Sequence, residues 1–155
     1  QQIFAYLLLG ALAIGLLVSI YSDLRHRLIL NAVTAPIALA APLYWYATGN
    51  FGWAAIGFQL LTAVCVLGLF TLFFALGAMG GGDVKLFTAL ALWFPWDTTM
   101  RLLLYASLLG LLVTIVFYLS HRFKGKPGRA RIPYGIAISL AGLIIISEPI
   151  FNHFG

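Results

Sequence analysis

Long runs of apolar residues alternate with short polar segments along the whole chain. A helix needs about 20 apolar residues, within a range of about 17–25, to cross the hydrocarbon core of a bilayer. The pattern predicts six such helices, in the segments Ile3–Tyr21, Ala32–Ala47, Trp53–Ala78, Val84–Trp96, Thr99–Ser120 and Pro133–Phe151. The fourth is short, which is tolerated where protein or a water-filled cavity surrounds it. We therefore expect an all-α membrane protein, a polytopic bundle of six transmembrane helices.

The composition requires the surface of this bundle to face lipid. Of the 155 residues, 63% are hydrophobic and only 8% are charged, whereas soluble domains are about 25% charged. Neither a linker nor a soluble insert interrupts the pattern, so residues 1–155 are expected to form a single membrane domain. The first apolar run has no basic segment before it and no small-residue cleavage site after it. It is expected to be a retained helix and not a signal peptide.

The basic residues predict the orientation of the helices. Six crossings place segments 22–31, 79–83 and 121–132 on one side, with Lys85 just inside the fourth helix, and all nine lysines and arginines except Arg101 lie there. By the positive-inside rule that side is cytoplasmic, and both termini lie outside the cytoplasm. The net charge of +5 is thus explained by orientation and by contact with anionic lipid, and we expect no nucleic-acid partner. An interfacial aromatic belt is predicted at the outer ends, from Tyr44, Trp45, Tyr46, Trp53, Trp93 and Trp96.

Only two of the four acidic residues lie at positions that make them candidates for a functional site. Asp97 and Glu148 lie near the outer ends of helices, where turn formation and solvation explain them. Asp23 follows the first predicted helix and Asp83 precedes the fourth, so both lie at the cytoplasmic edge. Ionisable residues at or within the membrane are functional candidates by default. A dyad of Asp23 and Asp83 is therefore the principal candidate site.

Two adjacent carboxyl groups do not readily ionise together, so one keeps a proton while the other can deprotonate water. This is the chemistry of an aspartic protease, and it needs no cofactor and no metal. Helix-end electrostatics alone predict that Asp23, near the end of a helix, keeps the proton, and that Asp83, near a helix start, is the anion. The position of each residue also has a simpler interpretation. Asp83 could be a helix N-cap, and Asp23 could pair with Arg25 or Arg27.

A dense group of glycines precedes Asp83, at positions 77, 80, 81 and 82. One glycine would be enough to end a helix. The run predicts a bend at which another helix or an extended substrate approaches the backbone closely.

Three stretches resemble motifs of the type IV prepilin peptidases. Residues 80–86, Gly-Gly-Gly-Asp-Val-Lys-Leu, resemble the family's G-x-G-D motif. Residues 23–31, Asp-Leu-Arg-His-Arg-Leu-Ile-Leu-Asn, resemble its other aspartate motif, and residues 131–138, Arg-Ile-Pro-Tyr-Gly-Ile-Ala-Ile, resemble the start of its last helix. The resemblance implies an intramembrane aspartic endopeptidase of the bacterial inner membrane, with Asp23 and Asp83 catalytic. It implies cleavage of the leader of prepilins and pseudopilins at the cytoplasmic face, at a glycine that precedes an apolar helix.

The resemblance also suggests supporting residues: Gly80, Gly82, Lys85, Pro133, Tyr134 and Gly135. Lys85 is expected to reach lipid headgroups or substrate and not Asp83, because residues i and i+2 of a helix do not face each other. The chain departs from the family at Leu30, where proline is usual, and by lacking the cytoplasmic insert with paired cysteines. It thus resembles the compact form of tight-adherence (Flp-type) pilus systems, and no motif supports methylation of the product.

Other functions remain open from the residues alone. A preflagellin peptidase-like enzyme or another G-x-G-D protease would use a similar aspartate pair; the presenilin type carries a Tyr-Asp dipeptide, whereas here Ser22 separates Tyr21 from Asp23. A small proton- or cation-coupled transporter would also place carboxylates in the membrane. Transport sites usually lie near the midplane, where this sequence predicts no acidic residue.

Overall fold

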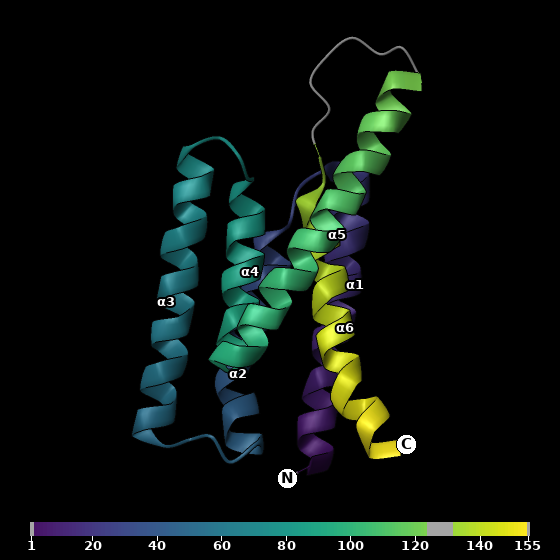
Figure 1. The fold of residues 1–155 in the computed structure, drawn as a ribbon. Helices are drawn as coiled ribbons and strands as arrows, with labels where there is room; N and C mark the ends of the chain where they lie inside the picture. Colours follow the sequence, from purple (N-terminus) through teal and green to yellow (C-terminus); the bar gives the residue numbers. More distant parts are fainter. Residues whose placement is uncertain (1, 124–131, 155) are drawn as a thin grey trace.

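The computed structural model describes the backbone of residues 2–123 and 132–154, and the side chains of 2–120 and 132–148. Within these ranges the chain forms helices only (Figure 1). The helices are α1 Gln2–His26, α2 Asn31–Ala47, α3 Trp53–Ala75, α4 Gly81–Trp93, α5 Trp96–Phe123 and α6 Tyr134–Phe154. The prediction of an all-α bundle of six helices is confirmed, and α1 begins and α6 ends at the same end of the bundle.

Three helices are long and apolar enough to cross a membrane on their own. They lie at Gln2–His26, Trp53–Ala75 and Trp96–Ser120. The described apolar part of α6, Tyr134–Glu148, is shorter, and α4 has only 13 residues. The short fourth helix is therefore confirmed as a feature of the fold.

Four other helices, α2, α3, α5 and α6, contact α4, which explains how so short a helix is accommodated. Of its 13 residues, the buried ones are Asp83, Val84, Leu86, Phe87, Ala89, Leu90, Ala91 and Trp93. It packs against α2, α3 and α6, and the ring of Phe87 stacks on Phe70 of α3 at a centroid distance of 4.5 Å. A helix that is largely covered by protein need not match the thickness of the bilayer.

The end of α4 opposite Asp83 is fixed by side chains that bind backbone carbonyl groups. The indole of Trp45 donates to the carbonyl of Leu92, and that of Trp93 donates to the carbonyl of Ile37, each at 2.7 Å. The amide of Gln59 donates to the carbonyl of Ala91 at 2.7 Å and also to that of Phe94. The last carbonyl groups of a helix lack partners within the helix, and Trp45 and Gln59 supply them at the end of α4, whereas Trp93 bonds to a carbonyl inside α2.

The predicted aromatic belt is therefore only partly correct. Trp53 is 93% exposed and Trp96 is 55% exposed, as expected for residues that anchor the bundle at the interface. Trp45 and Trp93 are instead buried in the protein at 8% and 2% exposure, and the ring of Tyr44 lies 5.1 Å from that of Trp93. Trp45 and Trp93 can lie in the core because the indole N–H group of each donates to a backbone carbonyl there.

Candidate functional site

Asp23 lies in the last turns of α1, because this helix continues past the predicted end at Tyr21 to His26. The helix stops where Arg27 adopts a left-handed conformation with φ of 52°. The following loop is tied back by the hydroxyl of Ser22, which donates to the carbonyl of Leu28 at 2.6 Å. Asp23 is consequently buried, with 4% of its surface exposed.

The first turn of α6 binds the carboxylate of Asp23. The backbone N–H of Ile136 donates to Asp23 Oδ2 at 3.1 Å. A Cβ atom at Gly135 would lie 2.7 Å from the same oxygen and 2.6 Å from Ile29 Cδ1, so only glycine lets the carboxylate approach the helix. Donor groups and the positive end of the helix dipole both stabilise an anion at such a position.

Asp83 lies in the first turn of α4 and is 8% exposed. The helix is capped by Gly80, and the backbone N–H of Gly80 donates to Asp83 Oδ2 at 3.3 Å. Asp83 is thus not the N-cap residue, although its side chain does bind the N-cap backbone as in a capping box. Local capping and a chemical role are compatible, because the second oxygen of the carboxyl group remains for other contacts.

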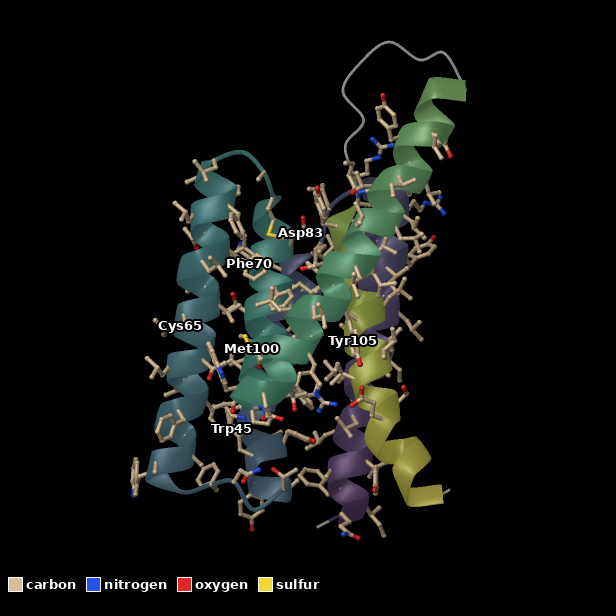
Figure 2. The ribbon with its side chains drawn as sticks, in the orientation of Figure 1. Trp45, Cys65, Phe70, Asp83, Met100 and Tyr105 are labelled. Atoms are coloured by element: carbon tan, nitrogen blue, oxygen red, sulfur yellow. The ribbon has the colours of Figure 1, made fainter. Side chains whose placement is uncertain are left out.

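The two carboxyl groups are close enough to repel each other. Asp83 immediately precedes the apolar segment Val84–Trp96 that the sequence predicts to span the membrane. Burial, together with the negative charge of Asp23, raises the pKa of Asp83 to about 7, against a weaker opposite effect of the Gly80 hydrogen bond. Figure 2 shows Asp83 at the end of the bundle opposite Trp45. The fold therefore brings together two acidic residues that are sixty positions apart in the sequence.

The glycine run before Asp83 provides the close approach that its density predicts. Gly77, just after the end of α3, adopts a left-handed backbone conformation with φ of 73°. A Cβ atom at Gly82 would lie 3.1 Å from Ile29 Cβ and 3.4 Å from the backbone nitrogen of Ile29. The segment that approaches is thus the chain's own loop between α1 and α2, which links the surroundings of Asp83 to those of Asp23.

The other predicted supporting residues have contacts of their own. Lys85 is exposed and its ammonium donates to the side-chain oxygen of Asn31 at 3.0 Å, so it turns away from Asp83 as expected. Pro133 is buried immediately before α6, and the ring of Tyr134 lies beside Gly110 of α5.

Neither aspartate forms an ion pair among the side chains that the structure describes. The guanidinium of Arg25 donates to the hydroxyl of Tyr21 at 2.9 Å, and the single ion pair found there joins Arg101 to Glu148 at 2.7 Å. The interpretation of Asp23 as the partner of Arg25 is therefore wrong. The basic side chains at 122–131 lie outside the described residues. In the described part of the chain, three or more potential metal ligands do not gather anywhere.

The comparisons of this sequence with known proteins agree on one family. The sequence model of the type IV leader peptidase family matches residues 10–115. The chain is 28% identical to the prepilin leader peptidase/N-methyltransferase of Legionella pneumophila, over 96% of the chain and 53% of that protein. It is 30% identical to the protein of the same name from Dickeya chrysanthemi, over 89% of the chain and 51% of that protein. The chain thus spans about half the length of these relatives.

No solved structure matches the chain significantly. The family match covers more than half of the chain and includes both aspartates and the glycine run. The stretch at 131–138 lies beyond that match. This chain, a multi-pass helical membrane protein, belongs to the type IV leader peptidase family.

Proposed function

We propose that the protein is an aspartic endopeptidase that removes the leader peptide of type IV prepilins and pseudopilins. The observation that carries the proposal is the burial of two carboxyl groups, Asp23 and Asp83, at helix ends that share the neighbour Ile29. The family membership supports the choice of substrate class. Methyl transfer, which the names of the relatives also mention, is left out because the chain aligns with only about half of each relative.

The environment of each carboxyl group favours one division of roles. Asp83, with its raised pKa, carries the shared proton, and Asp23, held by the first turn of α6, is the anion. This reverses the assignment expected from the ends of α1 and α4 alone, because that assignment did not include the start of α6. Asp23 takes a proton from water, and the water oxygen attacks the peptide carbonyl carbon while Asp83 donates a hydrogen bond to the carbonyl oxygen. The leaving amine then receives the proton from Asp23.

The location of the pair supports a cut at the cytoplasmic face of the inner membrane. Six crossings with this distribution of basic residues favour a cytoplasmic position for Asp23 and Asp83. A prepilin presents its leader there while its apolar helix remains in the bilayer. The short segment between α1 and α2 favours the compact enzymes of tight-adherence (Flp-type) pilus systems, with an Flp-type prepilin as substrate.

Co-expression with an Flp-type prepilin tests the proposal. Wild-type protein is expected to shorten the prepilin, which is measured by gel mobility and by mass spectrometry of the new N-terminus. Asp23→Asn and Asp83→Asn are each expected to reduce cleavage by more than about a thousandfold, since members of a catalytic unit are each essential. Asp97→Asn, an exposed aspartate at the other end of the bundle, is the matched control and should cleave normally.

The outcomes separate the alternatives. Cleavage that survives Asp23→Asn or Asp83→Asn would overturn the dyad. A wild-type protein that is folded in the membrane but cleaves no prepilin would overturn the proposed substrate class.

A further inference from the structure

A buried hydroxyl group near Asp23 has no partner. Ser139 of α6 is 0% exposed, and its oxygen is the one buried side-chain nitrogen or oxygen without a hydrogen bond among the described residues. Other helical hydroxyl groups in this protein donate to the carbonyl four residues earlier: those of Ser19, Thr62, Thr88, Ser107 and Thr114. A buried hydroxyl that makes no hydrogen bond costs about 1–3 kcal/mol, so Ser139 calls for an explanation.

The register of α1 against α6 shows what Ser139 faces. A Cβ atom at Gly135 would touch Asp23, and one at Gly142 would lie 2.9 Å from Leu16. The two glycines are seven residues apart, and so are Asp23 and Leu16, as the antiparallel packing of two helices requires. Ser139, four residues after Gly135, therefore faces Ser19, four residues before Asp23.

Ser19 completes a pair of small, buried, polar residues below the carboxylate. It is also 0% exposed, and its hydroxyl donates to the carbonyl of Gly15 at 3.0 Å. The donor of Ser19 is thus used while its oxygen can still accept. The hydroxyl of Ser139 can both donate and accept.

The distance from this pair to Asp23 suits one water molecule. Residues four apart on a helix have Cβ atoms about 5–6 Å apart, so Ser139 lies at about that distance below the point where Gly135 meets Asp23. Side chains on a helix lean toward its N-terminus, which brings the hydroxyl of Ser139 toward Asp23. A single water that makes two hydrogen bonds of about 2.8 Å spans such a gap.

We infer that Ser139 and Ser19 bind a buried water molecule that donates a hydrogen bond to the carboxylate of Asp23. Ser139 donates to the water, and the water donates to Ser19 and to Asp23, which gives it the three partners typical of a buried site. Ser139 is thus a positioning residue. It acts on Asp23 from α6, while the charged groups that act on Asp23 are Asp83 of α4 and Arg27, which follows α1.

Infrared spectroscopy of the purified full chain in detergent tests the water site without relying on activity. A buried water is expected to give an O–H stretching band that shifts in heavy-oxygen water. The band should be lost in Ser139→Ala and kept in Ser139→Thr. Thr62→Val is the matched control, because Thr62 is buried on α3 and its hydroxyl is already bonded to Phe58. Persistence of the band in Ser139→Ala, or its absence from the wild type, would overturn the inference.

Kinetics test the positioning role, and this part rests on the proposed function. With a purified prepilin, Ser139→Ala is expected to lower kcat by about tenfold with KM unchanged, since one hydrogen bond to the reacting carboxylate is lost. Ser139→Thr should restore kcat, and Thr62→Val should leave it unchanged. Ser19→Ala should lower kcat less, and the double variant should be no worse than Ser139→Ala. Equal kcat in Ser139→Ala and wild type would overturn the role, whereas a wild type without activity would count against the proposed function alone.

Discussion

Gly135 determines where the carboxylate of Asp23 can lie. Its missing side chain leaves space that Asp23 Oδ2 and Ile29 Cδ1 occupy, and this space brings the oxygen within reach of the Ile136 N–H. The effect is steric and local, so it can be tested by one methyl group.

Gly135→Ala is expected to move Asp23 away from α6, because a Cβ atom at 2.7 Å from an oxygen cannot be accommodated without a shift. We expect a loss of prepilin cleavage of at least about tenfold and a loss of stability of about 1–3 kcal/mol. Cleavage rate and thermal unfolding in detergent measure the two effects. Gly10→Ala is the control, because nothing lies within 4 Å of a Cβ atom there; equal effects of the two substitutions would contradict the steric role of Gly135.

The charge of Asp83 makes stability depend on pH. Its pKa is raised from 3.8 to about 7 in the folded protein, so the folded state holds a proton that the unfolded chain releases. The wild type should therefore lose stability as pH rises from about 4 to about 7, by an amount of the order of a few kcal/mol. Above pH 7 this contribution should stay constant.

Asp83→Asn removes this dependence. The variant should unfold at a higher temperature than the wild type at pH 8 and at nearly the same temperature at pH 4, although it is expected to be inactive. Thermal unfolding in detergent across this range measures the effect, with Asp97→Asn as the control. If the wild type instead became more stable than Asp83→Asn as pH rises from 4 to 7, the predicted direction of the pH dependence would be wrong.

At the scale of helices, the buried α4 depends on polar contacts at its ends as well as on its apolar sides. The indole of Trp93 donates to the carbonyl of Ile37 at 2.7 Å, and the residue is 2% exposed. This contact joins α4 to α2 near the two prolines of α2, Pro36 and Pro42, where helical hydrogen bonds are interrupted.

Trp93→Phe is expected to destabilise the protein by about 1–3 kcal/mol, because it removes a buried donor and leaves a carbonyl group without that partner. Trp53→Phe should change stability by less than about 0.5 kcal/mol, since Trp53 is almost fully exposed. Chemical unfolding in detergent compares the two. Similar losses would mean that the N–H group of Trp93 contributes little.

The apolar runs predicted the six helices because hydropathy reports where the chain is in lipid. They did not predict the true ends of α1, since the helix extends through Ser22 and Asp23, polar residues that become buried only when α6 packs against them. The same limit explains the error at Trp93. Hydropathy gives the depth of a residue, but not whether it faces lipid or another helix.

At the scale of the whole molecule, the site depends on which helix ends meet. The distribution of basic residues predicted that Asp23 and Asp83 share one face, and in the structure Ile29 lies beside both Gly82, which precedes Asp83, and Gly135, which Asp23 approaches. The start of α6 could not be recognised as part of the site from local pattern, because its donor is a backbone N–H group that any residue other than proline carries. The resemblance of residues 131–138 to a family motif pointed to this segment, but the role of Gly135 depends on contacts between distant segments.

The orientation in the membrane can be tested by single cysteines in a Cys65→Ala background. Asn50→Cys, between α2 and α3, should react with a membrane-impermeant thiol reagent applied to spheroplasts, whose inner membrane is intact. Ala78→Cys, between α3 and α4, should react only after the membrane is permeabilised, because that turn is expected to be cytoplasmic. Mass shift on a gel measures both, and the reverse pattern would invert the assigned orientation.

The contact between α1 and α6 also has a consequence for biosynthesis. Asp23 emerges from the ribosome early, but the groups that hold it, Gly135 and the Ile136 N–H, are made more than a hundred residues later. A nascent chain that has inserted only its first five helices therefore has both aspartates and no ordered pair. The contact that holds the carboxylate of Asp23 can therefore form only after residues 135 and 136 have been synthesised and α6 has packed against α1.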